Sequence, residues 1–403
     1  MRTLLALLVL SHPLLADDWT RYRGPNGTGV SNATGLPTTW DEKTNVVWKT
    51  PVHDKGWSSP VVLGKQVWVT TAREDGKAQW AVCVDRDSGK VVHDVKVFDT
   101  PKVPYFFMKD YNSHASPTPA IEPGRVYVHF GSAGTACLDT ETGKVLWSRR
   151  DLPCDHWRAP GSSPVLWNDL VILTFDGYDR QYLAALRKRD GSTAWEAKRE
   201  VVVPDDNGDL KKAYSTPSLI EANGRTLLVS PGATNTLALD PATGQEVWKV
   251  LHGGMNTATP PVVAGGKVFV TTGNPSHLVA IGLDGKVAYK VTREVPQRPG
   301  PISHNGLLFL VSDNGIATCL DPKTGDGVWT RRLGGQFYSS PVCAEGRLYV
   351  FDKKGKGTVL TADREGKVLA TNQLAGGVIA TPAIAGKALY VRTNTHLYRV
   401  EQR

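Results

Sequence analysis

The stretch Ala238–Trp248 reads ALDPATGQEVW. It places an aspartate two positions after a small residue, a glycine four positions after the aspartate, and a tryptophan four positions after the glycine. We interpret it as a strand ending at Asp240, a turn at Gly244 and a further strand carrying Trp248, because glycine favours turns and aromatic residues favour strands. The same order, with cysteine in the first position, recurs at Cys137–Trp147 and Cys319–Trp329.

Around this element the chain repeats with a period of about 40 residues. Each unit opens with a proline that follows a small residue, and then runs through short apolar strands separated by glycine turns. The opening prolines are Pro60, Pro117, Pro164, Pro217, Pro260, Pro301, Pro341 and Pro382. The second strands are rich in β-branched and aromatic residues, as in Val268-Phe269-Val270, and no helical period appears. Such repeats predict an all-β propeller with one blade per unit.

The last unit lacks a fourth strand, because the sequence stops at Arg403 after its third. A matching strand with its tryptophan, Asn45–Lys49, lies just before the first unit. Pairing the two would close the ring and remove an open sheet edge. We therefore predict an eight-bladed β-propeller of four-stranded antiparallel blades over residues 17–403, closed by the N-terminal outer strand.

The aromatic residues that end the units are expected to wedge between blades and to hydrogen-bond to the neighbouring blade, rather than to bind a ligand. They are Trp147, Trp195, Trp248, Tyr289 and Trp329, with His93 and Ala370 replacing them in two units. The five cysteines are an odd number, and Cys83, Cys137 and Cys319 occupy the small-residue position. They are interpreted as buried small residues and not as a disulfide framework.

The N-terminus has the pattern of a secretory signal peptide over residues 1–16. Arg2 precedes the apolar run Leu4–Leu10, and Ala16 offers a cleavage point. A buried N-terminal strand is the less favoured alternative. The run is too short to cross a bilayer, which takes about 20 residues. We expect an exported chain, soluble in the periplasm or cell envelope after cleavage.

The formal net charge is +8. Basic residues are scattered along the chain and form only short pairs such as Lys211-Lys212. Nucleic-acid binding proteins usually concentrate basic residues on one face, so this distribution argues against a nucleic-acid partner.

At these repeats the chain resembles the propellers built from pyrroloquinoline-quinone (PQQ) repeats, whose pattern Ala-x-Asp-x-x-x-Gly-x-x-x-Trp is intact at Ala238–Trp248. The pattern is decayed in other units, where Arg187, for example, replaces the aspartate. One branch of this superfamily, the quinoprotein alcohol dehydrogenases, holds PQQ and calcium on the propeller axis. Another branch is non-catalytic and includes the BamB-like propellers of outer-membrane protein assembly.

The dehydrogenase branch carries an adjacent cysteine pair, and no two cysteines are adjacent here. The most metal-like run, Asp205–Asp209, lacks the glycine and the glutamate of an EF-hand and reads as a solvated turn. Neither a catalytic residue nor a metal site can be assigned. PQQ remains possible as a cofactor, without support from the residues.

Ligands should bind at the mouth of the channel, where the innermost strands begin. Residues three positions before each opening proline should form one ring at this rim, because blades superpose by rotation. They are Trp57, His114, Gly161, Tyr214, Thr257, Arg298, Tyr338 and Ile379. A ring that only packs between blades is an equally good interpretation.

Two long insertions lead into innermost strands and should overhang the same face. Residues 98–112 include Tyr105 and Tyr111, and residues 151–159 include His156 and Arg158. Loops on a rigid scaffold often carry function. Equally, the aromatic residues could anchor the loops, and His156 is more simply interpreted as a loop anchor.

The candidate binding residues are Trp57, Tyr111, His114, His156, Arg158, Tyr214, Arg298 and Tyr338. The favoured hypothesis is a monomeric, non-catalytic binding or assembly propeller. The resemblance implies a BamB-like role, and the expected partner is an envelope protein or small ligand at the channel face. The alternative is a quinoprotein-like enzyme or PQQ carrier.

Overall fold

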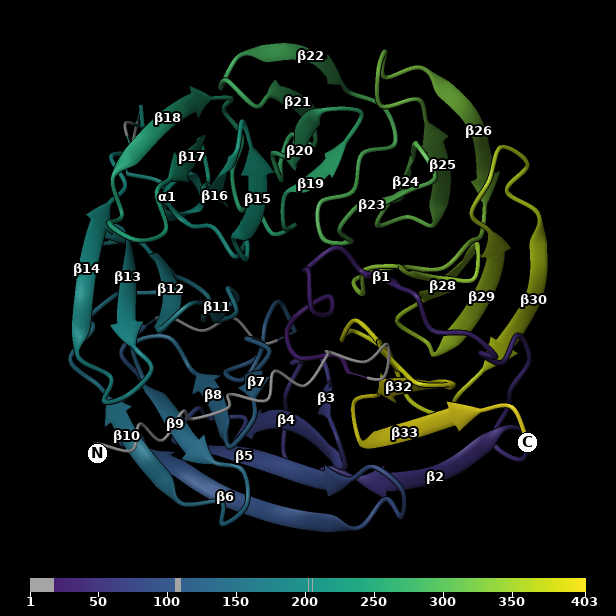
Figure 1. Cartoon of the computed structure of the whole chain (residues 1–403), viewed down its shortest axis with the longest axis horizontal. Helices are drawn as coiled ribbons and strands as arrows, with labels where there is room; N and C mark the ends of the chain where they lie inside the picture. The colour runs from purple at the N-terminus through teal and green to yellow at the C-terminus, as the bar shows by residue number, and fades with distance from the viewer. Residues whose placement is uncertain (1–17, 106–109, 202, 205) are drawn as a thin grey trace, which may run out of the picture.

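The computed structural model describes residues 18–105, 110–201, 203–204 and 206–403. The expected signal peptide, residues 1–16, lies outside this part of the chain. The described residues form eight sheets around a central axis, and the sheets follow one another around the ring in chain order (Figure 1). The prediction of an eight-bladed β-propeller with four-stranded antiparallel blades is confirmed.

We number the blades one to eight in chain order of their innermost strands. The innermost strands are β3 (Val61–Leu63), β7 (Ala120–Glu122), β11 (Val165–Trp167), β15 (Ser218–Ala222), β19 (Val262–Ala264), β23 (Ile302–His304), β27 (Val342–Ala344) and β31 (Ala383–Ala385). The second strands are β4 (Gln66–Ala72), β8 (Arg125–His129), β12 (Leu170–Asp176), β16 (Arg225–Pro231), β20 (Lys267–Thr271), β24 (Leu307–Val311), β28 (Arg347–Phe351) and β32 (Ala388–Arg392).

The third strands are β5 (Ala78–Asp85), β9 (Thr135–Asp139), β13 (Gln181–Arg187), β17 (Asn235–Leu239), β21 (Leu278–Gly282), β25 (Ile316–Leu320), β29 (Lys356–Thr361) and β33 (His396–Glu401). The outermost strands are β6 (Val91–Asp99), β10 (Val145–Arg149), β14 (Thr193–Lys198), β18 (Glu246–Leu251), β22 (Val287–Val291), β26 (Gly327–Arg332), β30 (Val368–Gln373) and β2 (Val46–Pro51). Two short elements complete the set, β1 (Val30–Ser31) and α1 (Gly208–Lys211). Within the described part of the chain, no helix is long and apolar enough to cross a membrane.

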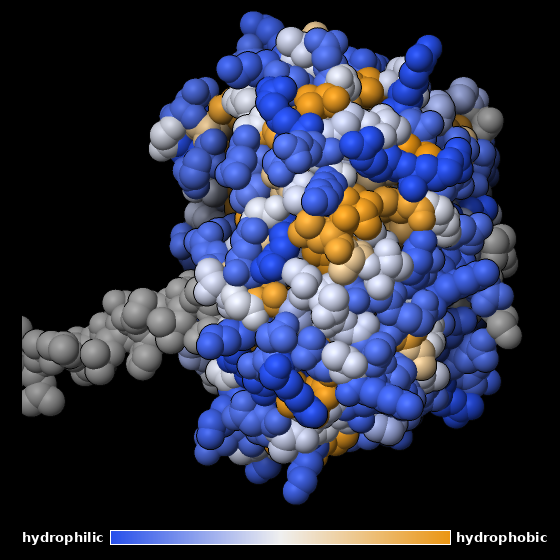
Figure 2. Space-filling model, turned by 90° about the vertical axis from the view of Figure 1, so that its right-hand side faces the viewer, coloured by the Kyte–Doolittle hydropathy of each residue, from blue (hydrophilic) through white to orange (hydrophobic). Residues whose placement is uncertain are grey.

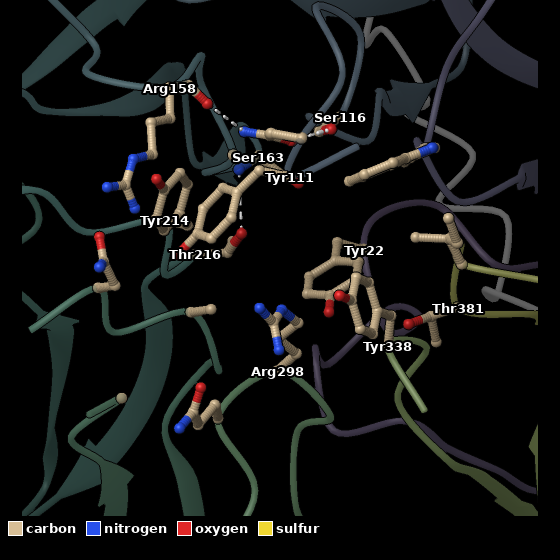
Figure 3. A pocket seen from close by; sticks show the side chains of 18 of the residues that line it. Tyr22, Tyr111, Ser116, Arg158, Ser163, Tyr214, Thr216, Arg298, Tyr338 and Thr381 are labelled. Carbon is tan, nitrogen blue, oxygen red and sulfur yellow. Dashed lines mark hydrogen bonds between the residues drawn. The ribbon is translucent and has the colours of Figure 1, made fainter. Parts of the chain in front are cut away.

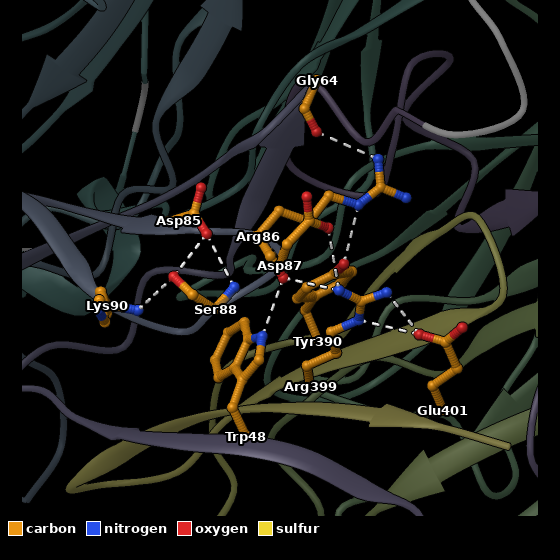
Figure 4. A network of polar contacts seen from close by, with 10 residues as sticks. All are labelled: Trp48, Gly64, Asp85, Arg86, Asp87, Ser88, Lys90, Tyr390, Arg399 and Glu401. Atoms are coloured by element: carbon orange, nitrogen blue, oxygen red, sulfur yellow. Dashed lines mark hydrogen bonds and ion pairs between the residues drawn. The ribbon is translucent and has the colours of Figure 1, made fainter. Parts of the chain in front are cut away.

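The ring is closed by β2, which pairs antiparallel with β33 as its fourth strand. Trp48 on β2 donates its indole N–H to the Arg86 carbonyl of blade one at 2.9 Å. Arg86 in turn donates to the Tyr390 hydroxyl of blade eight, and Arg399 donates to the Arg86 carbonyl (Figure 4). The predicted closure is confirmed, and hydrogen bonds donated from each of blades one and eight to the other stabilise it.

The aromatic residues that end the units, called closing aromatics below, lie between blades, as predicted. The indole N–H of Trp147, Trp195 and Trp329 each donates to a carbonyl of the next blade, at 2.8–3.1 Å. Each ring also packs on the turn glycine of that blade. A Cβ on Gly244, for example, would lie 2.6 Å from the Trp195 ring, and its φ of +73° also favours glycine. The Asp-x-x-x-Gly-x-x-x-Trp pattern therefore encodes the contact between successive blades.

Blade seven departs from this pattern, because Ala370 replaces the aromatic residue. Trp40, which precedes β2 in the chain, packs into the junction of blades seven and eight. Its ring centroid lies 5.6 Å from that of Phe351, and its backbone N–H donates to the Asn372 side chain at 2.9 Å. A segment outside the repeats therefore supplies the missing ring.

The segment that precedes β2, which includes β1, also runs through the centre of the ring of blades (Figure 1). Trp19 exchanges two backbone hydrogen bonds with Val62 of β3, at 2.8 and 2.9 Å, and Ile121 of β7 donates to the Thr20 carbonyl. Arg23 is buried in the channel and donates to the Pro301 carbonyl. Further along, β1 pairs parallel with β27. The repeat pattern did not predict this path.

The face of the molecule that Figure 2 displays is mainly hydrophilic, with apolar areas among the polar side chains. The β30 strand lies on the side that Figure 2 displays, and its Val368 and Leu369 are 45% and 43% exposed. Single exposed apolar residues of this kind are normal on a folded protein.

Removing residues 17–50 should leave β33 with an open edge and cause aggregation, detectable by size-exclusion chromatography. A truncated chain that stays monomeric and melts cooperatively at the original temperature would contradict the closure.

In the intact chain, Trp48→Ala should lower the free energy of unfolding by about 3 kcal/mol, because it deletes a buried indole. Leu369→Ala is the matched surface control and should change the free energy of unfolding by less than about 0.5 kcal/mol.

Candidate functional site

A pocket of about 380 Å³ opens at the mouth of the channel where the innermost strands begin. Residues from most blades line it, together with the two insertions (Figure 3). Six of the eight candidate residues are in its wall, namely Trp57, Tyr111, Arg158, Tyr214, Arg298 and Tyr338. Gly161 and Ile379 of the predicted ring also line the pocket.

Arg298 points into the middle of this pocket (Figure 3). It donates to Asp313 at 2.8 Å, and its guanidinium carbon lies 4.3 Å from the ring centroid of Tyr338. The ammonium of Lys353 lies 4.3 Å from the same centroid. Cations held against an aromatic face keep their charge and lose little side-chain freedom on binding. Arg298 retains 29% exposure of its side chain, so part of it is accessible to a ligand.

Arg158 forms the opposite wall with Tyr111 and Tyr214. Its two terminal nitrogens bind both carboxylate oxygens of Asp209 at 3.0 Å, a bidentate pair. Its guanidinium carbon lies 4.8 Å from the Tyr111 ring, which is 6.2 Å from that of Tyr214. Asp209 also accepts the indole N–H of Trp157 at 2.9 Å.

The loop that carries Arg158 has an unusual backbone. Trp157, Arg158 and Ala159 have φ values of 38°, 74° and 72°, a left-handed conformation that costs roughly 1–2 kcal/mol per ordinary residue. The side-chain amide of Asn112, from the other insertion, donates to the carbonyls of Arg158, Ala159 and Pro160 at 3.0–3.3 Å. The two insertions therefore hold each other, and strain of this kind is concentrated at functional positions.

His114 and His156 are not among the residues that line this pocket. His114 is buried, and its Nδ1 lies 2.9 Å from the hydroxyl of Tyr105 in the first insertion. His156 is buried as well, and its Nε2 accepts the backbone N–H of Ser132 at 3.0 Å. Both histidines sit under the insertions, in keeping with the interpretation of His156 as a loop anchor.

Tyr22 and Asp209 are among the lining residues that the sequence did not predict. Tyr22 comes from the N-terminal segment, and its hydroxyl lies 3.3 Å from that of Ser340. Asp209 was assigned to a solvated turn, but helix α1 brings it to Arg158. Asp205 of the same run lies outside the described residues. Nothing in the sequence around a single aspartate in a polar run indicates that it pairs with an arginine from another loop.

Aromatic rings, two arginines, amides and hydroxyls make this pocket suited to binding. Its amides are Asn112, Asn256, Asn274 and Gln297, and its hydroxyls include Ser116, Ser163 and Thr216. None of the five cysteines lines it; all are buried and unpaired. Within the described residues, no three His, Cys, Asp or Glu side chains are grouped so as to hold a metal ion.

In sequence, this chain is similar to BamB proteins. The family model described as outer membrane protein assembly factor BamB matches residues 27–150, 179–300 and 291–369. The BamB of Legionella pneumophila (strain Paris) is 25% identical over 236 residues, which are 58% of this chain and 48% of the relative. The matched region thus spans about half the length of that relative.

Two solved structures share the fold. BamB from Moraxella catarrhalis superposes with a TM-score of 0.64 and 14% identity, covering 88% of this chain and 99% of the other. A europium-containing methanol dehydrogenase superposes with a TM-score of 0.74 and 13% identity, covering 93% and 89%. At such identities the likeness concerns the fold alone.

The buried histidines under the site give the fold a pH dependence. Burial lowers the pKa of His114 to about 4 and that of His129 to about 3, and it holds the pKa of His156 well below its usual range. Free histidine titrates near pH 6.5, so the unfolded chain binds these protons at a higher pH than the folded chain does. Stability must therefore fall as the pH drops from about 6.5 toward 4.

Urea denaturation at pH 7, 6 and 5 should show a decreasing free energy of unfolding. Carboxylates titrate near pH 4 and contribute little in this range. The variant His114→Asn, which cannot titrate, should show a shallower decrease than the wild type. Equal stability of the wild type at pH 7 and pH 5 would be inconsistent with neutral buried histidines.

Proposed function

The chain belongs to the family of outer membrane protein assembly factor BamB, and from this membership we propose that it is an exported, non-catalytic propeller of the cell envelope. Its role is to hold a partner protein of the envelope, as a binding or assembly scaffold. The observation that carries the proposal is the pocket at the channel mouth, where Arg298 and Tyr338 stand partly exposed on a rigid ring.

The composition of this mouth supports recognition of a protein. Tyrosine, tryptophan and arginine are the residues that dominate binding energy at protein interfaces, and they act best in preformed pockets. Here, Arg158 and Arg298 are each fixed by an aspartate, so a partner meets side chains that are already oriented.

Export is part of the proposal and rests on the N-terminal pattern. We infer cleavage after Ala16, and N-terminal sequencing of the native protein checks it. An intact Met1 in the native protein would contradict export by this route.

Arg298→Ala and Tyr338→Ala should each weaken partner capture by about 1–2 kcal/mol, or roughly five- to thirtyfold in affinity. Both variants should melt like the wild type, because each side chain borders the open pocket. The test is quantitative pull-down from an envelope extract. Arg189→Ala is the control, since Arg189 is also paired with an aspartate but is 82% exposed outside the pocket.

Unchanged recovery of partners by both folded variants would place the binding site elsewhere. Reduced recovery that follows a reduced melting temperature would assign these residues a structural role.

A quinoprotein-like enzyme or PQQ carrier is the second candidate, favoured by the methanol dehydrogenase fold. The residues do not fit that cofactor well. The cysteines are separate and buried, and the described residues offer no cluster of carboxylates to hold calcium. Absorbance and mass of the purified protein after addition of PQQ and calcium discriminate between the two functions.

A further inference from the structure

The opposite mouth of the channel holds a larger groove, of about 1100 Å³. It lies over the innermost strands β11, β15 and β19 of blades three to five, and the N-terminal segment, from Asp18 to Val30, forms its other wall. This groove shares no lining residue with the pocket at the first mouth. It is therefore independent of the function proposed above.

One position of the repeat explains what the groove exposes. In blade one this position is Val62 of the innermost strand β3. It pairs with Val67, which is the second residue of the neighbouring strand β4. The equivalent residues in blades one to eight are Val62, Ile121, Leu166, Glu221, Val263, Ser303, Cys343 and Ile384. Six of the eight are apolar or cysteine, so the position suits a covered surface.

The N-terminal segment covers only part of this ring. It pairs through its backbone with Val62, Ile121 and Cys343, and these residues are at most 1% exposed. In the blades that it does not reach, Val263 is 41% exposed and Leu166 is half-buried. The same repeat position is therefore buried in the three blades whose strands pair with this segment and open in blades three to five. In blade eight Ile384 is buried too, in a core cluster that also holds Trp19.

We propose that the open half of this mouth binds an extended, apolar segment of a partner polypeptide. The segment adds its backbone to the inner edges of β11, β15 and β19, as Trp19 and Thr20 add theirs to β3 and β7. Its apolar side chains cover Leu166, Trp167 and Val263.

The charge of the groove selects a basic residue in that segment. Glu221 occupies the repeat position between Leu166 and Val263 and is exposed. Asp18 also lines the groove, and the lining residues include one arginine, Arg21. Glu122 lines it as well, but its carboxylate is paired with Lys188 at 2.6 Å. The exposed carboxylate of Glu221 favours a lysine or arginine facing it.

The probe is a fluorescein-labelled heptapeptide of alternating valine and threonine with lysine at its centre, and its binding to the native chain is measured by fluorescence anisotropy. A second peptide has glutamate at the centre. The wild type should prefer the lysine peptide, and Glu221→Lys should reverse that preference. Val263→Asp should weaken binding by about tenfold or more.

Val287→Asp is the matched control, since Val287 lies on β22 of the same blade and is 43% exposed, away from the groove. It should bind like the wild type. Arg298→Ala should do so too, which separates this site from the one at the first mouth.

Three results would overturn the proposal. The first is equal affinity of the wild type for both peptides, or no loss in Val263→Asp. The second is a dimer that Val263→Asp dissociates, which would assign the groove to a second copy. The third is binding of the lysine peptide that Arg298→Ala abolishes and Val263→Asp spares, which would assign the peptide to the first mouth.

Discussion

The contact between each closing aromatic residue and the glycine turn of the next blade determines the rest of the molecule. A ring wedged against a turn glycine, which has no Cβ, determines how far one blade is rotated from its neighbour. The hydrogen bond from the indole N–H to a backbone carbonyl determines how the two blades are placed along the propeller axis. Together with Trp40, which supplies the ring at blade seven, these contacts bring β33 to β2. They also bring the residues before each innermost strand to a common rim, so the pocket at that rim is a consequence of blade packing.

This relation explains what could be predicted from the sequence. Residues at equivalent positions of the repeat have equivalent backbone positions around the ring. It could therefore be predicted that Trp57, Tyr214, Arg298 and Tyr338 lie at the same mouth of the channel. Whether a side chain stays open depends on what lies over it, and the repeats carry no information on that. Tyr105 lies against His114 because an insertion happens to return there. The N-terminal segment likewise has no repeat, and its route through the channel to Val62 follows from tertiary packing alone.

The same segment gives the two mouths of the channel different characters. Its residues Tyr22 and Arg23 lie between them, with Tyr22 lining the first mouth and Arg23 buried. One mouth is therefore a small polar and aromatic pocket held by ion pairs, and the other is a wide, mainly apolar groove. A propeller that is symmetric in its strands thus becomes asymmetric in its chemistry through stretches that do not repeat, namely the N-terminal segment and the two insertions.

Closure of the ring by β2 and β33 has a consequence for the order of events during biosynthesis. The strand that completes blade eight is translated before any blade, and its partner is translated after all the others. During synthesis, Trp48 therefore emerges first and has no binding partner until the final residues follow. Pairing across such a long stretch of chain is slow, because loop-closure entropy must be overcome before the contact forms. An incomplete ring with exposed strand edges is a species that aggregates readily, so the chain is most prone to aggregation until its last strand has been made.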